Sequence, residues 1–159
     1  MSADRYDLRR VEDGGTLADA HAVRRAVFIE EQGVPEMVEL DGLDDRASHV
    51  VAYVREETDE KTGEGVAQAD RPVGTARLRT KDGVAKPERV AVREEHRGAG
   101  LGRRLMDAIE SIAREQGCDR ASLHAQTSVE AFYHDLGYET TSDEFEQAGI
   151  PHVEMTKKL

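Results

Sequence analysis

Apolar residues recur along the chain with two periods, and each period predicts one kind of element. Alternation of apolar and polar positions predicts a strand at 5–11. Spacing of three and four residues predicts a helix from Leu17 that ends at Gly33. Three stretches rich in β-branched residues then predict an antiparallel meander with a tight turn at Asp82-Gly83. Its strands are expected at 49–54, at 73–80 and at about 85–93.

The second half of the chain predicts a helix, a strand, a second helix and two final strands. The first helix begins at Leu101 and ends before Gly117, a typical glycine at the C′ position. The strand at 120–126 follows the one at 85–93 through this helix, so a parallel crossover is expected. The second helix opens at Thr127 and closes at Gly137. The apolar faces hold Leu101, Leu105, Ala108, Ile109 and Ile112 in the first helix, and Val129, Phe132, Tyr133 and Leu136 in the second.

The connecting segments carry turn and cap signals. Two pairs of residues resemble capping boxes, in which a threonine and an acidic residue three positions later satisfy free N–H groups. Polar segments rich in acidic residues or glycine predict loops. The capping boxes are Thr16 with Asp19 and Thr127 with Glu130; the loops are 36–48 (or a short helix there), 56–72, and the link from strand 138–141 to strand 153–157, which holds Phe145 and Gly149-Ile150-Pro151-His152.

This order of elements predicts an α/β fold. We expect a mixed, mostly antiparallel sheet of six to seven strands with helices on both faces. A length of 159 residues suits a single domain, 1–159, with a sizeable core.

The stretch around residues 90–102 predicts a binding site for an anion. Val90-Ala91-Val92 is a short apolar strand, and a glycine-rich bend leads from Arg97 into the helix. Unpaired N–H groups at a helix N-terminus favour negative charge, and glycines let a ligand approach closely, so we expect a pyrophosphate here. The dinucleotide fingerprint fails because Arg103 stands where its third glycine belongs, and the chain has no Gly-Lys-Ser/Thr triplet of a P-loop.

Three motifs resemble those of the GNAT superfamily of N-acetyltransferases. Arg97-x-x-Gly100-x-Gly102 matches the Arg/Gln-x-x-Gly-x-Gly/Ala signature of that superfamily. Val90-Ala91-Val92 resembles its splayed fourth strand, and residues 131–138 resemble its Phe-Tyr-x-x-Leu-Gly-Phe/Tyr segment. Further stretches resemble the ElaA-type branch: 27–35, Glu39-x-Asp41, His49, Gly74-Thr75-Ala76-Arg77, His124-Ala125-Gln126 and Gly149-Ile150-Pro151-His152.

The resemblance implies a splayed central strand pair and an enzyme that moves an acetyl group from acetyl-CoA to a primary amine by direct transfer in a ternary complex. The bend would hold the pyrophosphate of coenzyme A, and the freed strand backbone would pair with the pantetheine arm. A non-catalytic acyl-CoA-binding regulatory module is the alternative, and a transferase for longer acyl chains is another. The cofactor-binding residues implied are Val90, Ala91, Val92, Arg97, Gly98, Ala99, Gly100, Leu101, Gly102 and Arg103.

Two residues are candidates for the proton transfers of this reaction. Tyr133, in the Phe-Tyr-x-x-Leu-Gly segment, is the candidate general acid, because a phenol pKa of about 10 suits proton delivery to a leaving thiolate. Glu88 is the candidate general base, acting directly or through water. The alternatives are that Tyr133 only packs beside Phe132 and Leu136, and that Glu88 is a solvated strand end.

Four further residues are candidates for the acceptor side of the site. Glu39 and His49 are rivals of Glu88 as the base, and His124 points from the strand that lines the opposite wall. His152 either lines the acceptor pocket or anchors its loop. Each of these histidines also fits a structural role as a hydrogen-bonded side chain. The acidic run at 36–45 either attracts a cationic amine, such as a polyamine, or is solvated surface.

Charge limits the classes of partner. The net charge is −11, with 33 acidic and 22 basic residues, so nucleic acid is a poor partner. Only five of the basic residues are lysine, and few lysines with many carboxylates suggest a halophilic protein. The alternative is an ordinary acidic protein. Equal thermal stability in molar KCl and in dilute buffer would contradict the halophilic hypothesis.

Other patterns address the compartment and the chemistry. No apolar run approaches the ~20 residues of a membrane span, and the N-terminus lacks the layout of a signal peptide. The single cysteine, Cys118, excludes an internal disulfide and suits a reducing compartment, so a cytoplasmic protein is expected. The six histidines lack metal-site spacing, and no metal is expected. A homodimer is possible, since dimers are common in the superfamily.

Overall fold

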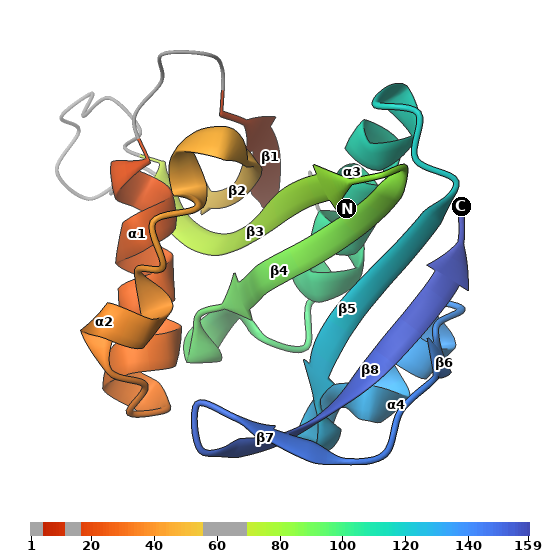
Figure 1. Ribbon diagram of the computed structural model, residues 1–159. Helices are drawn as coiled ribbons and strands as arrows, with labels where there is room; N and C mark the ends of the chain where they lie inside the picture. Colours follow the sequence, from red (N-terminus) through yellow and green to blue (C-terminus); the bar gives the residue numbers. More distant parts are fainter. Residues whose placement is uncertain (1–4, 12–16, 56–69) are drawn as a thin grey trace, which may run out of the picture.

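The computed structural model describes residues 5–11, 17–55 and 70–159, and within them it has an eight-stranded sheet (Figure 1). The strand order is β1-β2-β3-β4-β5-β8-β6, and β7 pairs with β8 off this path. The strands are β1 Tyr6–Arg10, β2 Ser48–Val54, β3 Arg71–Lys81, β4 Val84–Val92, β5 Arg120–Gln126, β6 Glu139–Thr140, β7 Phe145–Gln147 and β8 Ile150–Lys158. The helices are α1 Ala18–Arg24, the π-helix η1 Arg25–Glu31, α2 Glu36–Glu39, α3 Leu101–Glu115, α4 Glu130–Asp135, and the 3₁₀ turns η2 Asp44–Arg46, η3 Glu94–His96 and η4 Thr127–Val129.

The fold class predicted from the sequence is confirmed. All strand pairs within the described residues are antiparallel except β4 with β5, which is the expected parallel crossover. In Figure 1, α1 and α2 lie on the near side at the left, and α3 and α4 lie behind the sheet. None of the described helices is long and apolar enough to cross a membrane.

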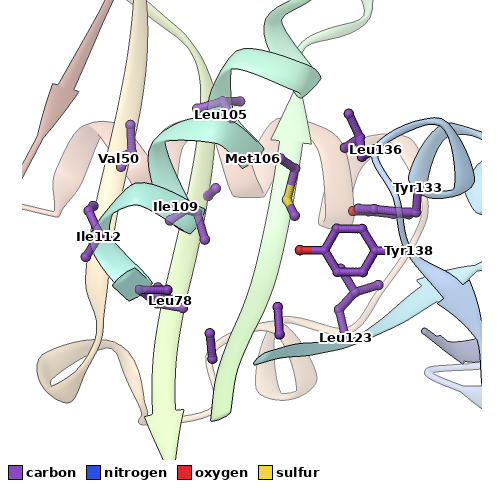
Figure 2. Packing of buried hydrophobic residues seen from close by; sticks show 14 of the residues in the cluster. Val50, Leu78, Leu105, Met106, Ile109, Ile112, Leu123, Tyr133, Leu136 and Tyr138 are labelled. Carbon is purple, nitrogen blue, oxygen red and sulfur yellow. The ribbon is translucent and has the colours of Figure 1, made fainter. Parts of the chain in front are cut away.

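The main core lies between α3 and the sheet, because the apolar stripe of α3 faces β2, β3 and β4. Figure 2 shows Leu105, Ile109 and Ile112 of α3 turned toward Val50 and Leu78 of the sheet. Burying such side chains contributes roughly 1.5–3 kcal/mol each. The predicted face of this helix was too narrow, since its buried residues also include Met106, Glu110 and Ala113.

Three local predictions are wrong. The pair Thr127 and Glu130 does not form a capping box, since neither η4 nor α4 has a side-chain cap; the Glu130 carboxylate instead accepts a hydrogen bond from Thr140. Val129 lies off the buried face, with 40% of its surface exposed. Phe145 belongs to β7 and His152 to β8, where a loop was expected.

Some predictions fall partly or wholly on residues that the structure does not describe. Thr16 lies outside the described residues, so its capping box with Asp19 is not placed. The Asp19 carboxylate accepts a hydrogen bond of 2.7 Å from Tyr53. Most of the loop expected at 56–72 also lies outside them, although Arg71 already belongs to β3.

Candidate functional site

The central feature of the sheet is the point where β4 leaves β5. Among the described residues the two strands pair only at Val84 with Arg120 and at Ala85 with Ala121. Beyond Ala85 they separate, so this edge of β4 has no neighbouring strand (Figure 1). Backbone N–H and C=O groups need partners, and an extended ligand with amide groups could pair with them as an added strand would. The expected splay of the central pair is therefore present.

A bulge in β4 lies inside this open stretch. Two β4 residues, Arg89 and Val90, stand opposite the single β3 residue Ala76. Arg89 has a φ of 53°, a region that residues other than glycine rarely adopt. Bulges of this kind re-aim side chains and are common beside active sites. The Arg89 guanidinium holds the bulge in place by donating to the carbonyl oxygens of Val38 at 3.3 Å and Glu39 at 3.2 Å.

The first turn of α3 presents unpaired N–H groups close after the end of β4. Gly100, the N-cap, has φ 80° and ψ 10°, and no side chain caps the helix. The N–H of Arg104 reaches the carbonyl of Gly100 at 3.1 Å. In the described part of the chain, the N–H groups of Leu101, Gly102 and Arg103 have no backbone partner. Three outward N–H groups and the helix dipole suit a diphosphate.

Gly102 allows close packing between the start of α3 and α4. A Cβ atom built at Gly102 would lie 3.0 Å from Cζ of Phe132, a tighter contact than nine in ten real Cβ atoms make. The absence of this atom lets the ring of Phe132 support the first turn of α3. The Arg103 guanidinium also reaches toward α4, with Nη2 3.5 Å from the carbonyl oxygen of Asp135.

Arg97, one of the predicted cofactor-binding residues, has its guanidinium bound to protein groups. Its Nη1 and Nη2 donate to the two carboxylate oxygens of Glu31 at 2.7 and 2.6 Å. Its Nε donates to the carbonyl oxygen of Val92 at 2.9 Å. Arg97 therefore connects the end of η1 to the end of β4, and the hydrogen bonds from Arg97 lower the pKa of Glu31. The other predicted strand residues divide between the two faces, with Ala91 packed toward α1 and Val90 and Val92 toward α3.

Tyr133 lies in an apolar environment between α3 and the sheet. Figure 2 shows its side chain extending from α4 toward Met106, beside Tyr138. Burial raises the pKa of Tyr133 to about 12, so the phenol is protonated at neutral pH. The rings of Phe132 and Tyr138 contact it edge to face, with centroids at 5.0 and 5.8 Å. Within the described residues the Tyr133 hydroxyl makes no hydrogen bond, and its proton is therefore not committed to a protein acceptor.

Glu88 lies on the opposite face of the sheet, where two arginines hold its carboxylate. Arg79 donates through Nε and, at 2.9 Å, through Nη2, and Arg77 donates through Nη2 at 3.2 Å. Burial alone would raise the pKa of Glu88, but the hydrogen bonds from Arg79 and the charge of Arg77 outweigh burial and lower it. Glu88 is thus ionised at neutral pH, the state a base requires, but it accepts a proton less readily than an unpaired carboxylate would.

Glu39 and His49 are buried, which argues against direct contact with an acceptor. Glu39 is 3% exposed, and both of its carboxylate oxygens accept hydrogen bonds from Arg24. His49 is also 3% exposed, and its Nε2 lies 3.0 Å from the carbonyl oxygen of Asp44, to which it must donate. Burial lowers the pKa of His49, so its imidazole is neutral and holds the segment that contains Asp44.

Arg77 is the centre of this buried cluster, with none of its surface exposed. It donates to Asp41 at 2.8 Å and to Asp44 at 3.0 Å, besides its bond to Glu88. The hydrogen bonds from Arg77 lower the pKa of Asp41 to about 2. The pKa of Asp44 is also lowered, because Arg24, His21 and Arg77 together outweigh the effect of burial. Asp41 and Asp44 are therefore paired with arginines rather than open to a cationic amine.

The opposite wall of the site comes from β5, β7 and β8. His124 is exposed, its Nδ1 lies 2.8 Å from Gln147 Oε1, and its ring contacts Phe145 edge to face. Phe145 stacks on His152, whose Nδ1 lies 2.7 Å from the carbonyl oxygen of Ile150. His124 is thus available to an acceptor, whereas His152 is buried and anchors the hairpin.

The burial of the arginines in this cluster was not predicted from the sequence. Arg24 and Arg77 are among the largest side chains with almost no exposed surface, yet neither was a candidate site residue, and Arg77 entered only through the resemblance of Gly74-Thr75-Ala76-Arg77. A signal was present for Arg77, which stands between the apolar residues Ala76 and Leu78 in the middle of a predicted strand. Within the described ranges, no group of three or more His, Cys, Asp or Glu side chains could hold a metal ion.

Comparisons with known proteins agree on one family. Residues 30–159 match the family described as an acetyltransferase (GNAT) domain. The uncharacterized N-acetyltransferase YjcF of Bacillus subtilis is 40% identical over 142 residues, covering 89% of this chain and 91% of that protein. A crystal structure of a Lactobacillus plantarum protein superposes with a TM-score of 0.81 at 30% identity, covering 98% of this chain and 99% of that one. Escherichia coli ElaA shares the fold, with a TM-score of 0.75 at 23% identity over 96% of this chain and 99% of its own.

The buried pair of Arg24 and Glu39 can be tested against an exposed pair from the same two segments. The substitution Glu39→Gln should lower the free energy of unfolding by about 3 kcal/mol, because it leaves a buried guanidinium partly unpaired. The control is Glu36→Gln, which removes the exposed partner of Arg25. This substitution should change the free energy of unfolding by less than about 0.5 kcal/mol. Urea unfolding followed by circular dichroism measures both values. Equal losses in the two variants would contradict the role assigned to Glu39.

Proposed function

The chain belongs to the acetyltransferase (GNAT) domain family, and we propose that it transfers the acetyl group of acetyl-CoA to a primary amine by direct transfer in a ternary complex. Membership supports acyl transfer as its general class of reaction. The acetyl donor, the primary amine and the direct route are our proposal. One observation carries it: the open edge of β4 runs toward the uncapped N-terminus of a 15-residue helix.

Bound acetyl-CoA would supply the thioester whose acetyl group is transferred. The N–H groups of Leu101, Gly102 and Arg103 would hold its diphosphate, and Gly98, Ala99 and Gly100 shape the bend before them. The open edge at Val90, Ala91 and Val92 would pair with the amide groups of the pantetheine arm. A backbone N–H on the open edge of β4 would polarise the thioester carbonyl. Arg97 would act through its link to Val92 rather than through the phosphate.

Tyr133 and Glu88 would carry the proton transfers. Because its pKa is raised, Tyr133 keeps its proton at neutral pH and can give it to the leaving sulfur. Glu88 is ionised and lies on the other face of the sheet, so it would take the proton of the incoming ammonium through water. His124 is the second candidate for this role, because its ring is exposed on the same face.

Cofactor binding is the first test, by calorimetric titration of coenzyme A into the folded protein. We expect binding to the native chain, and at least about tenfold weaker binding (~1.4 kcal/mol) after Gly102→Val, because the new side chain collides with Phe132 and displaces the first turn of α3. Ser111→Val, at an exposed position of the same helix, is the control and should bind as the native chain does. No heat with the native chain, in low and in molar salt, would overturn the proposed function.

The role of Tyr133 is tested by Tyr133→Phe, which keeps the ring and removes only the hydroxyl. The turnover number for acetyl transfer should fall by about 10²-fold, while the KM for acetyl-CoA stays within about twofold. Tyr53→Phe is the matched control, since its hydroxyl bonds to Asp19 on α1, and it should leave the turnover number unchanged. Steady-state kinetics with release of free thiol as the readout measures both. An unchanged turnover number in Tyr133→Phe removes the assignment.

A further inference from the structure

The arginines on the acceptor face are already paired, so they do not select an acceptor. Arg24, Arg77 and Arg79 bind the carboxylates of the acidic segment and Glu88. Arg89 binds Asp41 at 3.3 Å and backbone carbonyl groups. This cluster offers neither an unpaired carboxylate for a cationic amine nor an unpaired guanidinium for an anion.

A second group of cations lies where β4 and β5 begin. Lys81, Lys86 and Arg120 line an open pocket of about 350 Å³, together with the hydroxyl side chains of Ser122 and Thr156. Lys158 stands directly opposite Arg120 in the β5–β8 pair, on the same face. Figure 1 shows the turn into β4, the start of β5 and the C-terminal end of β8 side by side at the upper right. We call this site, lined by Lys81, Lys86 and Arg120, the basal pocket.

These cations differ from the arginines of the cluster in having no ion-pair partner among the described residues. Within 5–11, 17–55 and 70–159, the side chains of Lys81, Lys86, Arg120 and Lys158 form no ion pair. Two carboxylates also line the basal pocket, Asp82 and Glu154. The Glu154 carboxylate already accepts a hydrogen bond from Thr141 at 2.9 Å. Among the lining residues and Lys158, four cations stand against two carboxylates, an excess of positive charge in a chain whose net charge is −11.

The basal pocket opens on the same face of the sheet as Glu88. Ala85 and Leu123 belong to the core under α3, so their neighbours Lys86 and Ser122 point to the opposite face, as Glu88 does. The basal pocket sits at the closed end of the splay, because β4 and β5 pair only there. The bulge at Arg89 lies three positions beyond Lys86 on β4, which is roughly 10 Å along a strand.

We propose that the basal pocket binds an anionic group of the acceptor, a carboxylate or a phosphate, while the amine of the same molecule reaches the bulge of β4. The acceptor class is then an amine that carries an anion roughly 10 Å from its nitrogen. This inference rests on the proposed function, since it names the substrate of the same site. Charge-assisted hydrogen bonds from lysine and arginine would fix the anion, and the two hydroxyl groups would donate as well.

The test compares acceptors of matched length that differ in one terminal group. The panel is 8-aminooctanoate, 6-aminohexyl phosphate, the neutral 8-aminooctanamide and the cationic 1,8-diaminooctane, with 4-aminobutanoate as the short anion. We expect the two long anions to have kcat/KM values about tenfold above the neutral amide at low ionic strength, and the advantage to shrink in molar salt. The better of the two long anions identifies the anionic group as carboxylate or phosphate.

Two substitutions locate the effect. The double variant Lys86→Gln with Arg120→Gln should raise the KM for the long anions about tenfold and leave kcat and the neutral amide within about twofold. Arg10→Gln, which removes an exposed charge on β1, is the control and should leave kcat and KM unchanged for every acceptor. An equal loss of kcat/KM for every acceptor in the double variant, the neutral amide included, would overturn the assignment of the basal pocket.

The outcomes separate this inference from the function on which it rests. Acetyl transfer that favours the diamine or the neutral amide over both long anions overturns the anion site alone. No thiol release with any amine overturns the proposed function and this inference with it.

Discussion

The structure depends on a backbone constraint: β4 gives up its neighbour after two residue pairs. A strand inside a sheet normally satisfies its N–H and C=O groups on both sides, and unpaired groups are costly when water is excluded. Here only one edge of β4 loses its backbone partners, because β3 continues to pair with the other edge as far as Val92. An edge of this kind within a sheet is stable only if something else can pair with it, and a pantetheine arm has amide groups at suitable intervals.

The buried ion cluster explains how an irregular segment can form one wall of such a site. Residues 36–46 contain only one short helix and one 3₁₀ turn, so little regular hydrogen bonding holds them. Instead, Arg24 and Arg77 bind Glu39, Asp41 and Asp44 from two directions. Buried ion pairs add little net stability relative to apolar packing, but they are directional. The cluster thus positions the segment against the bulge at Arg89 more than it strengthens the fold.

The helices and strands that depend on local periodicity could be predicted from the sequence. The helix α3 and the strand β5 follow from the spacing of Leu101, Leu105 and Ile109 and from alternation at 120–126, and both are present. The glycine-rich bend was also readable, because glycine has a backbone role that does not depend on distant residues. The fold class followed from the order of the elements and from the family resemblance.

Ion pairs and strand irregularities that depend on residues far apart in the sequence could not be predicted from it. The Arg24–Glu39 pair spans 15 residues and the Arg77–Asp41 pair spans 36, so no sequence window shows that these charges are buried together. The bulge at Arg89 is a mismatch in register with β3, and neither strand alone reveals it. The capping box at Thr127 failed for the same reason, because Glu130 binds Thr140 from the following strand.

The balance of charge in the cluster has an evolutionary consequence. Four arginines, at 24, 77, 79 and 89, meet four carboxylates, at 39, 41, 44 and 88, so a change of one member leaves a charge uncompensated, at the greatest cost where the partner is fully buried. Descendants of a common ancestor are then expected to keep these eight positions together or to exchange them together for apolar residues. Covariation among them would trace this buried ion cluster through the family, even where the substrates have diverged.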